Sequence, residues 1–306
     1  MFYRRKVLLS LLKELDRPVN LVELQKLLFL VCFEQVKPRT YEFIPDKYGC
    51  YSFTIHSDQK ILTDQGYLTC IPNSQNKIYS EIHLNETAIN GVDIDLKQVD
   101  KVIVSKIASK YRKVTTRELI DVVYNLRPLY TINSEWLTQF TPDKDFQKSF
   151  QNVVERINAA PHALYTIGYE GLGIEGFIQK LILKNIKLVI DVRKNPISMK
   201  RDFSKSRLMK YLGEVGISYV HIPEVGITTE KRKEYLAENR RTELFTWYEE
   251  NTLHNCGDSI ERIHGLCAEQ NVVLLCYEKN PEDCHRSHLA DSCHKNFIDM
   301  DIKHIV

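Results

Sequence analysis

Three apolar segments in the second half of the chain end in side chains that can do chemistry. The segments are residues 165–170, 188–195 and 272–278. They finish in acids, an arginine and an asparagine, and the last is followed by the run Asp283-Cys284-His285-Arg286. In an open parallel sheet the carboxyl ends of the strands border the crevice in which ligands bind. The three segments therefore predict one shared site.

The acids of these segments, Glu170, Asp191 and Glu278, are the candidate catalytic residues. Cleavage of a glycosidic bond passes through an oxocarbenium-like transition state, which needs nearby negative charge and an activated water. Carboxylates from neighbouring strand ends can meet both needs. The structural alternatives are that Asp191 only pairs with Arg193 to tie a loop, and that Glu170 is a solvated surface residue.

A run of basic residues begins just after Asp191. Between residues 193 and 210 the only acid is Asp202, and the Lys and Arg residues are Arg193, Lys194, Lys200, Arg201, Lys205, Arg207 and Lys210. Such a run can contact phosphates although the net charge of the chain is only +2, and a solvated surface helix is the alternative. We predict contacts to phosphate or base from Arg193, Asn195, Lys200 and Arg201.

Two further residues beside the predicted strand ends can contact a nucleotide. Tyr169 offers a ring on which a flipped-out base can stack, and a place in the core is the alternative. His221 can act as a general acid or base or donate to a phosphate, and a structural histidine is the alternative.

The run Cys284-His285-Arg286 opens a predicted helix, whose N-terminus favours anions and lowers the pKa of a thiol. Cys284 can then be a nucleophile, as in thiol-dependent phosphatases or sulfur transferases. Alternatively, Arg286 and backbone amides can hold a nucleic-acid phosphate, with Cys284 and His285 lining that grip. Only one residue separates Cys284 from Arg286, whereas the thiol-phosphatase signature has five, so the grip is favoured.

We predict no metal and no cofactor. A zinc site from Cys284, His285, His288, Cys293 and His294 is the alternative considered, but paired Cys-x-x-Cys spacings are missing. Cys276 lies inside an apolar strand and is predicted to be core. The cysteines lack the spacing of a disulfide framework, which indicates reduced thiols and a cytoplasmic protein. No apolar run approaches a membrane span and no signal peptide is recognisable, so no membrane partner is expected.

Strand and helix patterns alternate in the C-terminal half, which predicts an α/β fold with a parallel sheet. The predicted strands are residues 164–167, 188–192, 218–222, 272–277 and 301–306. The predicted helices are residues 174–183, 205–214, 259–269 and 284–293, and residues 230–251 are predicted to be a helical stretch.

The N-terminal region has the pattern of a winged helix. Helices are predicted over residues 2–15, 21–33 and 51–65, followed by strands 67–70 and 77–80 around a turn. Asn20 is the expected N-cap of the second helix, with Glu23 completing a capping box. Winged helices often bind nucleic acid, and many mediate only protein contacts.

More helices are predicted over residues 85–160, one of them capped by Thr115, and 140–158 is predicted to be a connecting helix or linker. The predicted domains are 1–158, which binds nucleic acid or a partner, and 159–306, which carries the chemistry.

The C-terminal motifs resemble the family called domain of unknown function 488. They are Thr166–Gly171, Asp191–Pro196, Ser198–Phe203, Gly216–Gly226 and Leu274–Arg286, within residues 164–290, and Val225 stands where the family has Leu. The resemblance implies an association with DNA modification and phage defence, and one relative resembles a DNA glycosylase that removes modified bases. Residues 24–30 and 43–52 also resemble the Panacea-type domain of antitoxin-like proteins, with Cys50 where that family usually has Pro.

Together these observations predict a DNA-acting enzyme, most concretely a glycosylase that excises a modified base. DNA, with modified bases as one form, is the predicted partner. The alternatives are a Cys284-dependent phosphatase or sulfur transferase, and a non-enzymatic DNA-binding or antitoxin-like module. The sequence does not indicate protein partners.

Overall fold

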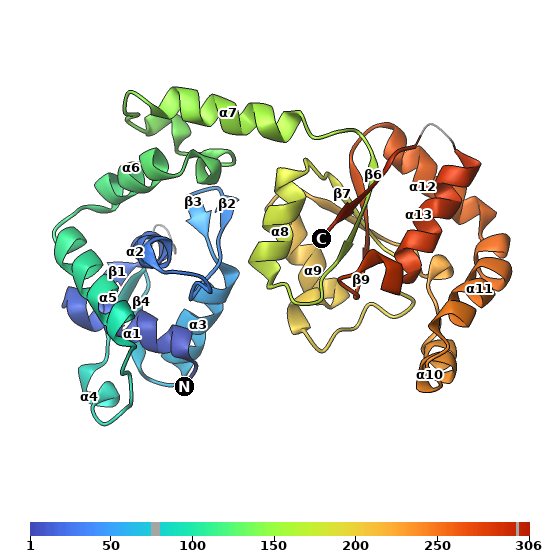
Figure 1. Ribbon diagram of the computed structural model, residues 1–306. Helices are drawn as coiled ribbons and strands as arrows, with labels where there is room; N and C mark the ends of the chain where they lie inside the picture. Colours follow the sequence, from blue (N-terminus) through green and yellow to red (C-terminus); the bar gives the residue numbers. More distant parts are fainter. Residues whose placement is uncertain (75–79, 298–299) are drawn as a thin grey trace. The chain divides into compact units, whose positions relative to one another are not determined.

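The computed structural model of the chain describes residues 1–74, 80–297 and 300–306. The chain forms two compact units, Met1–Val154 and Glu155–Val306 (Figure 1). None of the helices in the described residues has the length and hydropathy needed to cross a membrane.

The N-terminal unit begins with the element order of a winged helix. Three helices, α1 (Tyr3–Leu15), α2 (Leu21–Glu34) and α3 (Phe53–Asp64), accompany an antiparallel sheet of order β1-β5-β4. The sheet strands are β1 (Val19–Asn20), β4 (Leu68–Ile71) and β5 (Glu81–Leu84). A hairpin of β2 (Ile44–Asp46) and β3 (Gly49–Tyr51) precedes α3. This mainly helical region with small antiparallel sheets confirms the predicted fold class.

Local sequence signals predicted most of these helix and strand boundaries, but the structure differs from the prediction in two details. Asn20 caps α2 by accepting from the Glu23 N–H at 2.9 Å, as predicted. The Glu23 carboxylate, however, binds Arg17 and Thr116 rather than completing a capping box. Residues 77–79 of the predicted strand 77–80 lie outside the described residues, and the strand that pairs with β4 is β5.

The rest of the unit is helical. It contains α4 (Glu86–Ile89), α5 (Gln98–Tyr111), α6 (Thr116–Leu126) and the short 3-10 helices η2 (Pro128–Thr131) and η3 (Leu137–Gln139), and it ends within α7 (Phe146–Asn158). Thr115 caps α6 in the predicted capping box with Glu118. The core is built on the apolar faces of α1 and α2, where Leu8, Leu11 and Leu27 are fully buried.

The C-terminal unit is built on a five-stranded parallel sheet of order β10-β6-β9-β7-β8, as predicted from the strand–helix alternation. The strands are β6 (Leu164–Gly168), β7 (Leu188–Asp191), β8 (Ser218–His221), β9 (Val272–Cys276) and β10 (Ile302–Ile305). Every residue of β6, β7 and β9 is buried, because helices cover both faces of the sheet.

The helices divide between the two faces. Figure 1 shows α8 (Ile174–Leu183) and α9 (Lys205–Glu214) on one side of the sheet and α12 (Gly257–Ala268) and α13 (His285–Asn296) on the other. The short helices η4 (Arg201–Phe203), η5 (Pro223–Val225), η6 (Leu253–Asn255) and η7 (Pro281–Asp283) lie in the connections.

The helical stretch predicted over residues 230–251 is helical but divided in two. The chain forms α10 (Thr229–Ala237) and α11 (Arg241–Asn251), separated by a turn in which Asn239 has a φ of 56°. A left-handed residue cannot continue a right-handed helix, and asparagine is one of the few side chains that tolerate it.

Candidate functional site

The carboxyl ends of β6, β7 and β9, which precede the predicted site residues, meet at one edge of the sheet, as the sequence predicts. Gly168 lies beside Cys276 in the register of β6 with β9, and Asp191 lies beside Leu275 and His221 in the registers of β7 with β9 and β8. In a parallel sheet this is the edge where ligands bind. The structure therefore brings Glu170, Asp191, His221 and Glu278 onto neighbouring segments.

The segment after β9 lies against the end of β6. A Cβ on Gly168 would be 1.7 Å from the Glu278 carbonyl oxygen, so only glycine allows this approach. Two hydrogen bonds continue the contact: the Glu170 N–H donates to Tyr277 O at 2.9 Å, and the Lys279 N–H donates to the Glu170 carboxylate at 2.9 Å. The Gly168 position thus sets how closely Glu170 and Glu278 are held.

Asp191 has no free oxygen for catalysis. It is fully buried, and Arg193 donates to its two carboxylate oxygens at 2.8 and 2.5 Å. The Tyr219 hydroxyl donates to the second oxygen at 2.7 Å. Burial, followed by the neighbouring Asp191 charge, raises the pKa of Tyr219 far above its ordinary value, so this hydroxyl keeps its proton. The geometry fits the loop-tying role for Asp191 and Arg193.

Tyr169 is part of the core beneath the site. Its ring is buried and stacks on Phe203, with centroids 4.3 Å apart and planes within 8°. Its hydroxyl accepts from Arg193 at 2.9 Å and donates to Ser198 at 3.2 Å. A base therefore cannot stack on this ring in the described arrangement.

Tyr277 is an exposed aromatic residue at this edge. It is 39% exposed, and its ring makes an edge-to-face contact with Tyr169, with centroids 5.3 Å apart. Sequence reasoning missed it because Tyr277 was predicted to be the last residue of the apolar strand 272–277. The strand ends one residue earlier, at Cys276, which frees this side chain.

The loop after β7 presents most of the predicted contact residues to solvent, but not Arg193, which is buried against Asp191 and cannot contact a phosphate as predicted. Lys194, Asn195, Lys200 and Arg201 are all exposed. Between them, Ile197 is 83% exposed and Met199 is fully exposed, so this segment carries both exposed cations and exposed apolar side chains. Protein surfaces that bind nucleic acid combine these features, because cations contact phosphates and apolar side chains contact bases.

His221 and Gly226 hold the base of that loop. His221 Nε2 donates to the Arg193 carbonyl at 2.9 Å, which fits the alternative prediction that His221 is a structural histidine. A Cβ on Gly226 would lie 2.4 Å from the Lys194 nitrogen, so glycine is required here too. Asn195 donates to the Thr229 hydroxyl at 3.3 Å and Lys200 donates to the Leu172 carbonyl at 3.2 Å. These contacts are exposed and leave both residues accessible.

Glu278 is the carboxylate best placed for chemistry. Its side chain is 19% exposed, and one oxygen pairs with Arg232 of α10 at 2.6 Å. Burial acts to raise the pKa of Glu278, but the contacts with Cys284 and Arg232 outweigh it and hold the pKa below its ordinary value. The group is therefore ionised at neutral pH. Arg232 was missed because it lies outside the motifs and pairs with a residue 46 positions away in the chain.

Arg286 grips the protein rather than a phosphate. It is buried, and its guanidinium donates to the Glu278 carbonyl at 2.5 Å and the Lys279 carbonyl at 3.0 Å. The Arg286 guanidinium was predicted to donate to phosphates of a nucleic acid. It instead holds the segment that carries Glu278. Arg286 acts here as a positioning residue.

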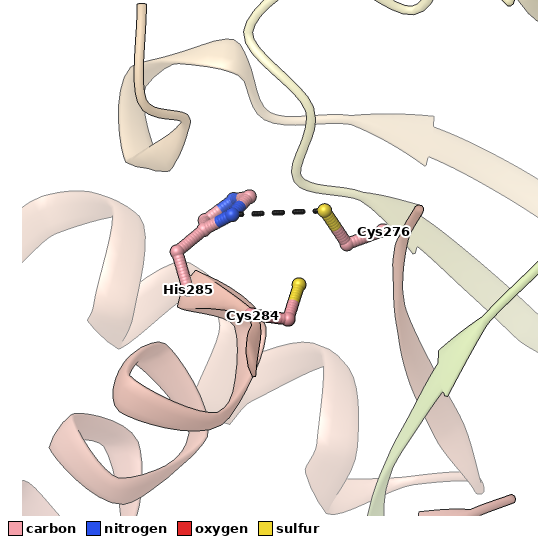
Figure 2. Close-up of side chains that lie close together, drawn as sticks. All are labelled: Cys276, Cys284 and His285. Carbon is pink, nitrogen blue, oxygen red and sulfur yellow. Dashed lines mark hydrogen bonds between the residues drawn. The ribbon is translucent and has the colours of Figure 1, made fainter. Parts of the chain in front are cut away.

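Cys284 and His285 lie with Cys276 in a buried cluster (Figure 2). Burial and the contact with Cys276 raise the pKa of the Cys284 thiol well above its ordinary value, whereas its position at a helix N-terminus predicted a lowered one. Desolvation outweighs the helix dipole because the thiol has no access to solvent. A buried, protonated thiol does not suit a nucleophile. Cys276 is core as predicted, and its place beside Cys284 was not foreseen.

A separate hollow of about 610 Å³ lies between α11, α12 and α13, lined in part by Glu249, His254 and His288. The residues of the strand-end site are not among those that line it.

The fold and the site define a two-unit α/β protein whose C-terminal parallel sheet carries acids beside an exposed basic loop. Residues 173–293 match the family model described as domain of unknown function DUF488. The C-terminal unit therefore contains a DUF488 domain, which agrees with the resemblance of the motifs. Four of the five motif stretches lie inside this range, and Thr166–Gly171 precedes it. The N-terminal region is unassigned. No curated protein and no solved structure gives a significant match to the chain.

Proposed function

We propose that this protein is a DNA-acting hydrolase that cleaves the N-glycosidic bond of a modified base, with phage DNA as a natural source of such bases. One observation carries the proposal: Glu170 and Glu278 stand on neighbouring strand ends beside a loop of exposed cations and apolar side chains. Carboxylates serve an oxocarbenium-like transition state, and the loop suits a polyanion with unstacked bases.

The roles of the acids follow from their surroundings. Glu278 is ionised and partly shielded, with its charge partner Arg232 fixing one oxygen, so it is the candidate base that activates water. Glu170 is exposed, and the Lys279 N–H orients its carboxylate, so it is the candidate that stabilises the sugar cation. Asp191 is a positioning residue, because Arg193 and Tyr219 occupy its oxygens.

Base release from DNA tests the proposal. The full chain is incubated with unmodified DNA and with phage DNA carrying modified bases, and the released base is measured by mass spectrometry. Alkali then converts abasic sites to strand breaks, which separates this activity from nuclease contamination. We expect Glu278→Gln to lower base release about 100-fold or more, in line with the loss of a general base.

Glu282→Gln is the matched control, because Glu282 is an exposed acid on η7, a few residues from Glu278. It should leave base release unchanged. Equal activity in wild type and Glu278→Gln on every DNA tested would refute the proposal.

A DNA-binding protein without catalysis is the competing function, favoured by the winged-helix order of α1, β1, α2, α3, β4 and β5. It predicts DNA binding with no base release, and no difference between wild type and Glu278→Gln in either measurement.

A further inference from the structure

We propose that Cys276, Cys284 and His285 bind a zinc ion. In the described part of the chain, these three side chains form a cluster of possible metal ligands. Their ligand atoms lie within 4.8 Å of one another. Figure 2 shows the imidazole and both thiols converging from the end of β9 and the start of α13. Two sulfurs and one imidazole nitrogen are a donor set that zinc prefers.

The spacing suits tetrahedral coordination. Cys276 Sγ is 3.6 Å from His285 Nδ1. Zn–S bonds of about 2.3 Å and Zn–N bonds of about 2.0 Å at a tetrahedral angle place sulfur and nitrogen roughly 3.5 Å apart. A zinc ion can therefore bridge this pair with little movement of either side chain.

The surroundings hold the imidazole as a metal ligand requires. His285 Nε2 donates to the Val192 carbonyl at 3.2 Å, which directs Nδ1 toward the two sulfurs. Ligating histidines commonly donate their second nitrogen to a carbonyl or carboxylate in this way. All three residues are buried, so the protein fixes their positions from every side.

The fourth position faces Glu278. Its Oε2 is 3.4 Å from Cys276 Sγ, and its side chain is the partly exposed one beside the three buried ligands. Glu278 is outside the group of three, and a water held by its carboxylate would complete the coordination. On binding, each cysteine sulfur exchanges its proton for a bond to zinc, and the protons pass to solvent.

This inference goes beyond the proposed function, because the ion would join the end of β9 to the start of α13 whether or not the protein cleaves DNA. Metal content is also measured without any DNA present. Failure of one proposal is therefore distinguishable from failure of the other.

The experiment measures zinc by mass spectrometry in the full chain, produced in zinc-supplemented medium and purified without chelator. We expect one zinc per chain in the wild type, falling to below about one tenth in Cys276→Ser and Cys284→Ser. Cys267→Ser and Cys293→Ser are matched controls, because both residues are buried cysteines of the same unit outside the cluster. They and Glu278→Gln should retain zinc.

Cobalt substitution of the wild type keeps the test independent of variant folding. Co²⁺ added to metal-free protein should produce thiolate charge-transfer bands and the visible absorption of a tetrahedral ion, both displaced by Zn²⁺. Wild-type protein without zinc and without these cobalt bands would overturn the proposal. So would a Cys276–Cys284 disulfide in freshly purified protein, or equal zinc loss in the Cys267 and Cys293 variants.

Discussion

Arg193 Nη2 lies 2.5 Å from Asp191 Oδ2 in a buried ion pair at the end of β7. The two residues are separated in sequence only by Val192, and Arg193 also donates to the Phe203 carbonyl at 2.9 Å. The pair therefore joins the strand end to the far side of the basic loop. Through this ion pair, Asp191 helps to set the geometry of the loop.

Removing one partner of this pair should strongly destabilise the C-terminal unit. Asp191→Ala leaves the buried Arg193 guanidinium without its counter-charge, which typically costs about 3–5 kcal/mol. Chemical denaturation of the full chain measures the loss. Asp202→Ala is the control, since its ion pair with Arg207 is exposed and worth about 0–1 kcal/mol and its other contact is one hydrogen bond from the Tyr211 hydroxyl, worth about 1 kcal/mol. Equal stability in the two variants would contradict the structural role.

Gly168→Ala should destabilise the unit and move Glu278. The new Cβ would overlap the Glu278 carbonyl oxygen, so the end of β6 and the segment after β9 must separate. We expect a loss of about 1–3 kcal/mol or more, as for an overpacked core. Gly213→Ala in α9 is the matched control, because its Cβ would meet no atom within 4 Å. That variant should be neutral or slightly stabilising by helix propensity.

The exposed loop should supply phosphate contacts to DNA. The double variant Lys200→Ala/Arg201→Ala should weaken DNA binding, and the slope of log affinity against log salt should fall by about one for each lost contact. Fluorescence anisotropy over a salt series measures both. Lys184→Ala/Lys187→Ala removes the same charge just before β7, at the opposite edge of the sheet. If both double variants bind alike, the loop is not the interface.

Tyr277 should provide a stacking surface for an unpaired base. Tyr277→Ala should lower affinity for single-stranded DNA by about 1–3 kcal/mol, the usual contribution of a base–aromatic stack. Tyr277→Phe keeps the ring and should bind as the wild type does. The same loss in both variants would indicate a role for the hydroxyl instead of the ring.

The N-terminal unit should lose stability at alkaline pH through Tyr124. Burial raises the pKa of Tyr124 to about 12, from an ordinary value of 10.0. The fold therefore keeps a proton that the unfolded chain releases, so the stabilisation is complete below pH 10 and is lost as the pH rises toward 12.

Tyr124→Phe has no phenol to ionise. Between about pH 9 and about pH 11 it should lose roughly 1 kcal/mol less stability than the wild type. The comparison uses the change with pH, because the substitution also removes the contact with Ser134 at all pH values. Parallel stability curves would contradict the expectation.

Most of the C-terminal architecture can be predicted from sequence, because its signals are local. The helix bounds of α8 and α9 follow directly from apolar spacing, and the strand–helix alternation indicates a parallel sheet. The grouping of Glu170, Asp191 and Glu278 at one edge follows from strand direction alone. The break between α10 and α11 was missed, since a single left-handed asparagine interrupts an otherwise helical pattern.

The sequence by itself determined which residues gather at the sheet edge, because side chains at the ends of parallel strands must meet there. Only the tertiary structure decided what each one contacts. Arg286 binds carbonyls rather than phosphate, Tyr169 stacks on Phe203, and Cys276 joins Cys284 and His285. These outcomes depend on burial and on contacts between segments far apart in the chain. Neither is encoded in the spacing of a motif.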